Sequence, residues 1–194
     1  NCYNGESYLH ECIESIVNQT YKNWELIFWD NNSSDNSLKI INSFKDKRIK
    51  IFKSKTYNNL YHSRNLAIEK CKGNYVCFLD VDDIWLKDKL KLQIKAILKD
   101  SSIKFLYTNY YILLNNKKTR FVRYVKKLNS GFITQKLLKS YDIGILTVMI
   151  DRKIFKSSKF NKLYNVIGDF DYFINLSLKY KIIALQKPLA IYRI

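Results

Sequence analysis

The sequence places three carboxylates within four positions, at Asp80, Asp82 and Asp83. Divalent cations such as Mg²⁺ and Mn²⁺ prefer oxygen ligands, and they commonly combine one or two carboxylates with the phosphates of a substrate. The cluster follows the apolar run 75–79 at a point where the chain must turn, so alternate carboxylates can converge on one ion. The alternative is that these acids only form a turn and cap the next helix, because D-x-D patterns also arise by chance.

Asp30, Arg64 and Tyr3 are residues of types that bind nucleotides. Asp30 ends the apolar run 24–29, where a carboxylate can accept a hydrogen bond from a uracil-type base or from ribose hydroxyls. Arg64 lies early in a predicted helix, from which its guanidinium can reach a base or phosphates. The ring of Tyr3 can stack on a base. Each residue also has a structural interpretation, as a turn or cap, a surface arginine and a packing tyrosine respectively.

Asp169 and Asp171 open an apolar helix, and they supply a candidate general base. A carboxylate is ionised at neutral pH, and it can accept the proton of a hydroxyl late in a reaction, as that oxygen bonds to an electrophilic carbon. Acidic residues are also favoured at helix N-termini as caps, which is the structural alternative. His62 is a less favoured rival for the base, because it lies in a loop-like stretch.

Motifs, cysteine content and charge limit the classes of protein to which the chain can belong. No G-x-S-x-G, H-E-x-x-H, G-x-x-x-x-G-K-[ST] or G-x-G-x-x-G motif occurs, which removes several common enzyme classes. The four cysteines form no C-x-x-C pair, so we expect them to be reduced and mostly buried, in a cytosolic protein. Apolar runs stay well below the roughly 18 residues of a membrane span. The net charge of +17 favours nucleic acid, anionic lipid or a phosphate-bearing substrate, although Lys-rich solvated helices explain it equally well.

The first 100 residues alternate between helices and strands that must position these side chains. Periodic apolar positions predict helices, and short continuous apolar runs predict buried strands. In chain order the expected elements are a helix over 6–19, a strand over 24–29, a helix after Ser34 or Asp35, a strand near 49–51, a helix over 60–72, a strand over 75–79 and a helix over 86–98. Strands joined by single helices form a parallel sheet that binds ligands beyond its carboxyl ends. The sequence therefore predicts an α/β, Rossmann-like fold with a mostly parallel sheet and helices on both faces.

The pattern changes after residue 100. A β-hairpin is predicted over 105–114 and 119–125, with its turn at 115–118. The remaining predicted elements are a helix over 134–141, a strand over 145–150, a helix over 170–180 and a strand near 189–192. Because no linker or internal repeat separates the halves, we expect one domain. This mixed region is where the hairpin and Thr147 would line a second substrate's site.

Taken in order, these segments resemble the family 2 glycosyltransferases with the GT-A fold. The resemblance extends over essentially the whole chain, and its ordered combination is far more specific than any single motif. The segments that carry it are 2–5, 8–9 and 15–21 for the opening helix, 25–30 with 33–35 for the nucleotide-binding strand and loop, 63–68 through 73–75 and 78–83 for the run into the D-x-D motif, 169–171 for the acidic motif of the base, and 189–193 after it.

The resemblance implies one GT-A domain over 1–194 that is truncated at both ends and lacks its first strand. Residues 1–100 would form the nucleotide-sugar-binding half, and residues 101–194 the acceptor-side half. Asp169 would be the catalytic base, and Asp82 would bind Mn²⁺ or Mg²⁺. The donor would be bound by Tyr3, Asp30, Arg64 and Asp80, with Cys2, Asn32, Asp83 and Asp171 as additional candidates.

By the same resemblance, the reaction would be an inverting transfer from a nucleotide-diphospho-sugar to a hydroxyl of a saccharide or lipid-linked acceptor, in surface polysaccharide or glycan biosynthesis. We expect a cytoplasmic location, with peripheral contact at the inner face of the membrane and no nucleic acid. The absence of a Q-x-x-R-W signature argues against processive synthesis. Two departures stand out: Asn31 and Asn32 replace residues that are often Asp and Gly, and Gly168 stands where Glu is frequent.

Two other functions fit parts of the sequence. A sugar nucleotidyltransferase also joins a parallel sheet to a divalent ion, but it would ordinarily show a Gly-rich basic loop, which is not visible. A basic module that binds nucleic acid or anionic membranes would require neither Asp82 nor Asp169, and its binding would weaken steeply with salt.

Overall fold

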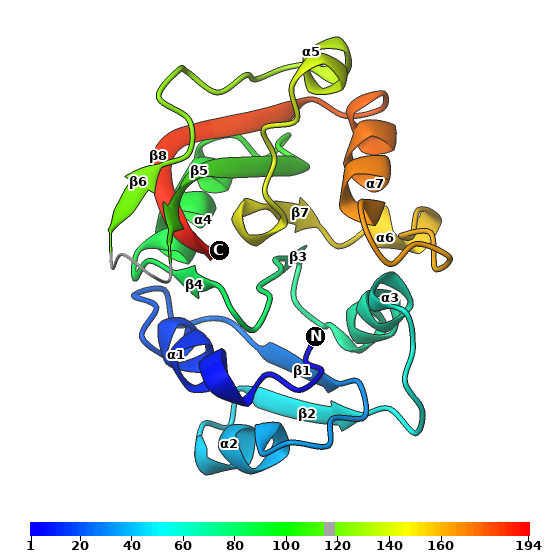
Figure 1. The fold of residues 1–194 in the computed structure, drawn as a ribbon. Coiled ribbons are helices and arrows are strands. Elements are labelled where there is room, and N and C mark those ends of the chain that lie inside the picture. Colours follow the sequence, from blue (N-terminus) through cyan, green and yellow to red (C-terminus); the bar gives the residue numbers. More distant parts are fainter. Residues whose placement is uncertain (115–118) are drawn as a thin grey trace.

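The chain forms two β-sheets, which the computed structural model describes through residues 1–114 and 119–194 (Figure 1). The smaller sheet pairs β1 (Leu26–Asp30) with β2 (Ile49–Lys53) in parallel, as expected of strands joined by a helix. It packs with α1 (Glu6–Val17) and α2 (Ser37–Ser43) at one end of the molecule. The predicted apolar stripe of α1 is buried in this part of the core. The small sheet therefore follows the prediction closely.

The larger sheet is mixed, whereas the sequence predicted a mostly parallel one. Its strand order is β3-β7-β5-β8-β4, with β6 paired to β5. The strands are β3 (Tyr75–Val76), β4 (Ile84–Trp85), β5 (Phe105–Leu113), β6 (Arg120–Val122), β7 (Met149–Asp151) and β8 (Ile182–Arg193). Within residues 1–114 and 119–194, only the β5–β8 pairing of this sheet is parallel, and the other four are antiparallel. The long strand β8 has register shifts against β5 and ends beside β4, a long-range pairing that no local pattern encodes.

Helices pack around both sheets. They are α3 (Leu60–Lys70), α4 (Lys89–Lys99), α5 (Thr134–Lys139), η1 (Ile145–Thr147), α6 (Ile154–Ser157) and α7 (Gly168–Ser177). Residues of α3, α7 and β5 share one hydrophobic cluster, so α3 contacts both β1 and the core of the second half. Figure 1 shows α3 in this intermediate place, near α6 and α7. Within 1–114 and 119–194, none of the helices combines the length and apolar content needed to cross a membrane.

Two expected elements differ from the prediction, and part of a third cannot be compared with it. The strand expected over 75–79 is a strand only at Tyr75–Val76. The strand expected over 145–150 begins as the 3-10 turn η1, in which Thr147 Oγ1 donates a hydrogen bond of 2.6 Å to the Gly144 carbonyl, before β7 starts. The hairpin is present as β5 and β6, but its expected turn at 115–118 lies outside the described residues.

A cavity of about 850 Å³ lies among α1, α3, α4, β1 and residues 75–81. Its wall is mostly apolar and includes Leu26, Phe28 and Val76, while Arg64 and Asp80 stand at a polar part of it. Cys2 extends the small sheet beside this cavity, because its N–H donates to the Trp29 carbonyl and its carbonyl accepts from the Asn31 N–H. The cavity explains the short strand: residues 77–80 have no ladder partner on that side.

Candidate active site

Arg64 and Asp80 form an ion pair at the end of the 75–80 segment. Nη2 of Arg64 donates to both carboxylate oxygens of Asp80, at 2.6 and 2.8 Å. Arg64 is 4% exposed, and Asp80 retains 34%. Burial acts to raise the pKa of Asp80, but the charge and hydrogen bonds of Arg64 hold that pKa below its usual range. The guanidinium that the sequence assigned to the donor therefore binds Asp80 through Nη2.

The next two carboxylates lie close together under the end of β8. Asp83 is 1% exposed, and burial together with the charges of Asp80 and Asp82 raises its pKa to about 8. Burial, and then the charge of Asp80, also raises the pKa of Asp82. Arg193 covers the turn from β8, since its N–H donates to Asp83 Oδ1 at 3.2 Å and its Nε donates to the Asp82 carbonyl at 3.0 Å.

This acidic cluster fits part of the coordination shell of a divalent cation. Its oxygens are hard ligands. Burial first, and then repulsion from neighbouring carboxylates, raises the pKa of both Asp82 and Asp83, and a cation would relieve that repulsion. In the described part of the chain, no group of three or more His, Cys, Asp or Glu side chains is arranged to hold a metal. A bound Mg²⁺ or Mn²⁺ would therefore need further ligands from a substrate or water, which such ions commonly retain.

Asp169 stands at the start of α7, and two tyrosines hold its carboxylate. The hydroxyl of Tyr61 donates to Oδ1 at 3.0 Å, and the hydroxyl of Tyr141 donates to Oδ2 at 3.3 Å. Ile167, the residue before α7, has φ 56°, a left-handed conformation that is strained for a β-branched residue. Such strain is common at functional sites, and here it sets the direction in which α7 begins.

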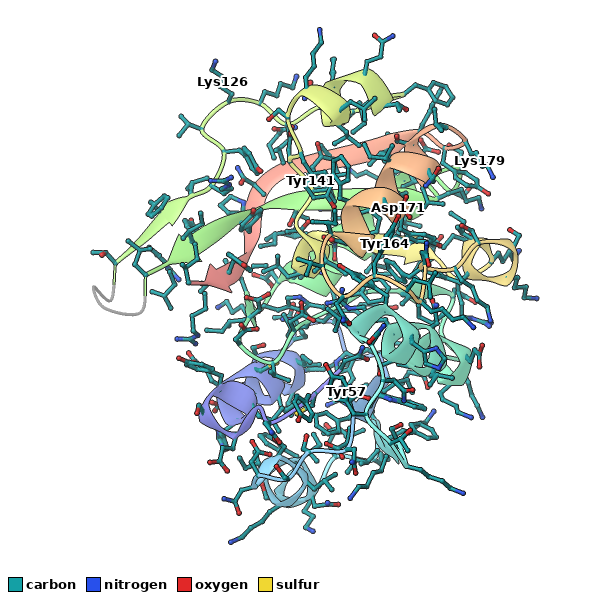
Figure 2. The ribbon with its side chains drawn as sticks, turned by 45° about the vertical axis from the view of Figure 1, so that its right-hand side comes forward. Tyr57, Lys126, Tyr141, Tyr164, Asp171 and Lys179 are labelled. Atoms are coloured by element: carbon teal, nitrogen blue, oxygen red, sulfur yellow. The ribbon has the colours of Figure 1, made fainter. Side chains whose placement is uncertain are left out.

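The other candidate bases are placed differently. Asp171 accepts a hydrogen bond of 3.2 Å from Asn175 on its own helix, and Figure 2 shows it on α7. Residues two apart on a helix do not share a face, so Asp171 and Asp169 point in different directions. His62 lies within α3 rather than in the loop-like stretch expected from the sequence. The adjacent Tyr61 is the residue that contacts Asp169.

A chain of side-chain contacts links Asp169 with the 80–83 cluster. Arg64 binds Asp80, and its Cζ lies 5.0 Å from the ring centroid of Tyr61, whose hydroxyl contacts Asp169. Tyr192 on β8 provides a second link: after burial, the charges of Asp83, Asp82, Asp80 and Asp169 raise its pKa. Carboxylates from distant parts of the chain are thus linked through Arg64, Tyr61 and Tyr192.

Four of the residues expected to bind the donor lie near the end of β1: Cys2, Tyr3, Asp30 and Asn32. Asp30 is fully buried, and its oxygens accept long hydrogen bonds of 3.3 and 3.4 Å from the Ser33 N–H. A base can therefore reach Asp30 only after neighbouring side chains move aside. Cys2 is buried against Ser33, and Asn32 has φ 66°, which Asn tolerates better than most residues and which accounts for the Gly it replaces.

Tyr3 is half-exposed and packs edge-to-face against Tyr57, with ring centroids 4.8 Å apart. Tyr57, labelled in Figure 2, was not anticipated from the sequence. Tyr61, Tyr141 and Tyr192 were also missed as site residues. Only Tyr61 carried a local signal, because it precedes Arg64 by three positions and so shares its helix face.

Comparisons with known proteins identify the family of the chain. The chain matches the model of the family "Glycosyl transferase family 2" over residues 1–164. The Escherichia coli protein UDP-Glc:alpha-D-GlcNAc-diphosphoundecaprenol beta-1,3-glucosyltransferase WfgD is 37% identical over 177 residues, which cover 91% of this chain and 66% of that protein. The putative teichuronic acid biosynthesis glycosyltransferase TuaG of Bacillus subtilis strain 168 is 32% identical over 155 residues, covering 78% of this chain and 60% of that protein. The chain thus spans less than two thirds of the length of these relatives.

Two solved structures show the fold. Residues 1–349 of S. aureus TarS in complex with UDP superpose with a TM-score of 0.83 at 20% identity, covering 99% of this chain and 58% of that one. The complex of the same protein with UDP-GlcNAc gives 0.80 at 19% identity, covering 99% and 56%. This likeness confirms the α/β, GT-A fold class. The fold, the family match and the two relatives agree, and the chain belongs to the family 2 glycosyltransferases.

Proposed function

We propose that the chain carries the catalytic centre of an inverting glycosyltransferase that uses a uridine-diphospho-sugar. The observation that carries this proposal is the continuous set of contacts from Asp80 through Arg64 and Tyr61 to Asp169. These contacts link two parts of the site. The carboxylates at 80–83 are suited to binding a cation with a diphosphate, and Asp169 is suited to accepting the proton of a hydroxyl. The printed names of WfgD and of the TarS complexes, which include UDP-Glc, UDP and UDP-GlcNAc, support a uridine donor.

Asp169 is the proposed general base. Its carboxylate takes the proton of the acceptor hydroxyl while that oxygen bonds to the anomeric carbon from the face opposite the leaving diphosphate. This single displacement inverts the configuration at the anomeric carbon, and no covalent intermediate forms. General base catalysis of this kind contributes roughly 10²–10⁴-fold. Asp171 is directed toward Asn175, so it takes no part in this step.

Asp82, assisted by Asp83, would hold a Mn²⁺ or Mg²⁺ together with the donor diphosphate. Such an ion supplies neutralisation of the charge that develops on the leaving group. Asp80 is kept ionised by Arg64, and it orders the turn on which Asp82 lies. Tyr3 and Tyr57 form an exposed aromatic pair beside Asp30 on which the uracil would stack.

The acceptor proposed is a lipid-linked saccharide of surface polysaccharide assembly. The printed names of WfgD and TuaG, which include a diphosphoundecaprenol carrier and teichuronic acid biosynthesis, support this class. A lipid-linked acceptor requires contact with a membrane, and the proposed location is therefore the inner face of the cytoplasmic membrane. Family membership also favours glycosyl transfer over the nucleotidyltransferase and the simple basic module considered from the sequence.

The membrane contact is assigned to the face around α5. Segments 120–141 and 174–187 contain Lys and Arg but no Asp or Glu, and the antiparallel bridge between Gly131 and Ile182 joins them. Phe132, Leu138 and Leu178 are exposed there, and Figure 2 shows Lys126 and Lys179 toward the same end of the molecule. Exposed apolar side chains among lysines are typical of surfaces that bind anionic lipid.

Two measurements test the proposal. Release of UDP is measured with UDP-glucose, UDP-GlcNAc and matched ADP- and GDP-sugars, with Mn²⁺ or with EDTA. We expect turnover of a uridine donor, and we expect this turnover to require the metal. Asp82→Asn should need a higher Mn²⁺ concentration to reach the same rate. Co-sedimentation with anionic vesicles is expected for the parent and reduced for Phe132→Ser, but unchanged for Lys39→Gln on α2. Metal-independent turnover or binding confined to neutral vesicles would contradict these assignments.

A further inference from the structure

Each carboxylate oxygen of Asp169 is held by a different tyrosine. Tyr61 reaches Oδ1 from α3, and Tyr141 reaches Oδ2 from the segment after α5. These contacts join parts of the chain separated from Asp169 by 108 and 28 positions. We propose that Tyr61 and Tyr141 are positioning residues that fix the orientation of Asp169, and that Gly168 is required because the Tyr61 ring occupies the place of a side chain there. This inference rests on the proposed function of Asp169 as the base.

The Tyr61 ring is enclosed on several sides. Tyr61 is almost fully buried, and its ring centroid lies 5.4 Å from that of Phe160 and 5.0 Å from Cζ of Arg64. A Cβ added at Gly168 would lie 2.5 Å from Cε2 and 2.6 Å from Cδ2 of this ring, much closer than van der Waals contact allows. Any side chain at position 168 must therefore push the ring, and with it the hydroxyl, away from Asp169.

The lack of a side chain at Gly168 thus leaves room for the Tyr61 ring. The sequence departs from the family pattern by having Gly where Glu is frequent, which leaves one acid fewer beside the base. In that space the structure places Tyr61, whose hydroxyl is an uncharged hydrogen-bond donor, instead of a second carboxylate. A hydrogen-bond donor stabilises the charged form of Asp169, whereas a neighbouring carboxylate would repel it.

Tyr141 holds the opposite oxygen. Its ring packs edge-to-face against Phe170, the residue after Asp169, with centroids 5.0 Å apart. Burial, and then the charge of Asp169, raises the pKa of Tyr141 well above its usual value, and the same causes raise that of Tyr61. Both hydroxyls therefore remain protonated donors across the working pH range, and neither competes for the proton that Asp169 accepts.

Two anchored oxygens define the plane of the carboxylate. Each oxygen keeps a second lone pair, so the acceptor hydroxyl meets a lone pair of fixed direction, and correct orientation is a large part of catalytic rate. Hydrogen bonds to a charged group contribute about 1.5–3 kcal/mol each, so they hold the carboxylate firmly in this orientation. Arg64 on α3 and Tyr192 on β8 also interact electrostatically with Asp169, and the variants below leave both in place.

The test compares Tyr61→Phe and Tyr141→Phe with Tyr172→Phe. Tyr172 is a buried tyrosine of the same helix as Asp169, but its hydroxyl donates to the Ser158 carbonyl. The probe is the uridine donor with the highest turnover in the panel above. For the first two variants we expect kcat to fall about tenfold with KM for the donor within about twofold, because loss of about 1.4 kcal/mol of orientation is tenfold in rate. Tyr172→Phe is expected to keep the parental kcat.

The split between kcat and KM separates positioning from mere folding. A general loss of folded enzyme would lower the kcat of Tyr172→Phe as well, whereas a loss of orientation at Asp169 affects only Tyr61→Phe and Tyr141→Phe. Gly168→Ala is expected to resemble Tyr61→Phe, and combining the two should cause no further fall in kcat.

The results distinguish this inference from the function on which it rests. If Asp169→Asn keeps parental turnover, Asp169 is not the base, and both fail. If Asp169→Asn is inactive while both Tyr→Phe variants keep the parental kcat, only the positioning role is overturned. An equal fall in kcat for Tyr172→Phe, or an additive effect of Gly168→Ala on Tyr61→Phe, would likewise contradict the inference.

Discussion

Replacing Arg64 by Leu should destabilise the chain in a strongly pH-dependent way. The substitution removes the guanidinium that lies 2.6 and 2.8 Å from the Asp80 oxygens and leaves that carboxylate without its main counter-charge. Breaking a fully buried ion pair costs about 3–5 kcal/mol. Because 34% of the Asp80 side chain is exposed to water, we reduce the expected cost at pH 7 to about 2–3 kcal/mol.

The pH dependence follows from the direction of the Asp80 pKa. In the parent that pKa lies below its usual range, so the pair stabilises the fold above the pKa of unfolded Asp80 and this stability is lost as pH falls through the folded pKa. In Arg64→Leu the unpaired carboxylate can be protonated at mildly acid pH, which removes its cost. The difference in unfolding free energy between parent and variant should therefore be smaller at pH 5 than at pH 7.

Urea unfolding at both pH values, without metal or nucleotide, measures this difference. We expect a lower midpoint at pH 7 with an unchanged m-value, which indicates a change in stability alone. The double variant Arg64→Leu with Asp80→Asn should recover about 1–2 kcal/mol at pH 7, because no buried charge is then left unpaired. Equal destabilisation at pH 5 and 7, or additivity of the two substitutions within about 0.5 kcal/mol, would refute the reasoning.

Two further predictions concern stability. Burial lowers the pKa of Lys89 to about 8, so the unfolding free energy of the parent should rise by about 3 kcal/mol relative to that of Lys89→Met as pH rises from 8 to 10.5, and equal slopes in thermal unfolding would contradict this. Burial raises the pKa of Asp83 to about 8, so stability is lost as pH rises from 4 to 8. Over that range Asp83→Asn in EDTA should become more stable relative to the parent, and a parallel pH dependence would argue against it.

Local patterns predicted the elements that have their own apolar period. The stripe of α1, the strand ending at Asp30 and the β5–β6 hairpin follow from neighbouring residues alone. The larger sheet could not be predicted in this way, because β8 pairs with β5 and β4 through contacts between distant segments. The strand expected over 75–79 has the right composition, but most of it borders the cavity and lacks a partner.

The same distinction between local and long-range contacts applies to the candidate site. Asp80, Asp82 and Asp83 are adjacent in sequence, so their clustering was visible before the fold was known. The place of Asp169 beside them depends on α3 and α7 sharing one hydrophobic cluster, which only the folded chain provides. Tyr141 gave no signal, since a tyrosine after a short helix usually packs, and Arg64 was expected to meet a ligand but pairs with Asp80.

The most direct test of the central claim is the rate of sugar transfer by Asp169→Asn compared with Asp171→Asn, under identical donor and Mn²⁺ concentrations. Both substitutions remove one charge from the first turn of α7, so their effects on folding should be similar. The account predicts that Asp169→Asn loses about 100-fold or more in kcat with a nearly unchanged KM for the donor, while Asp171→Asn stays within about threefold of the parent. Equal rates for the two variants would contradict it.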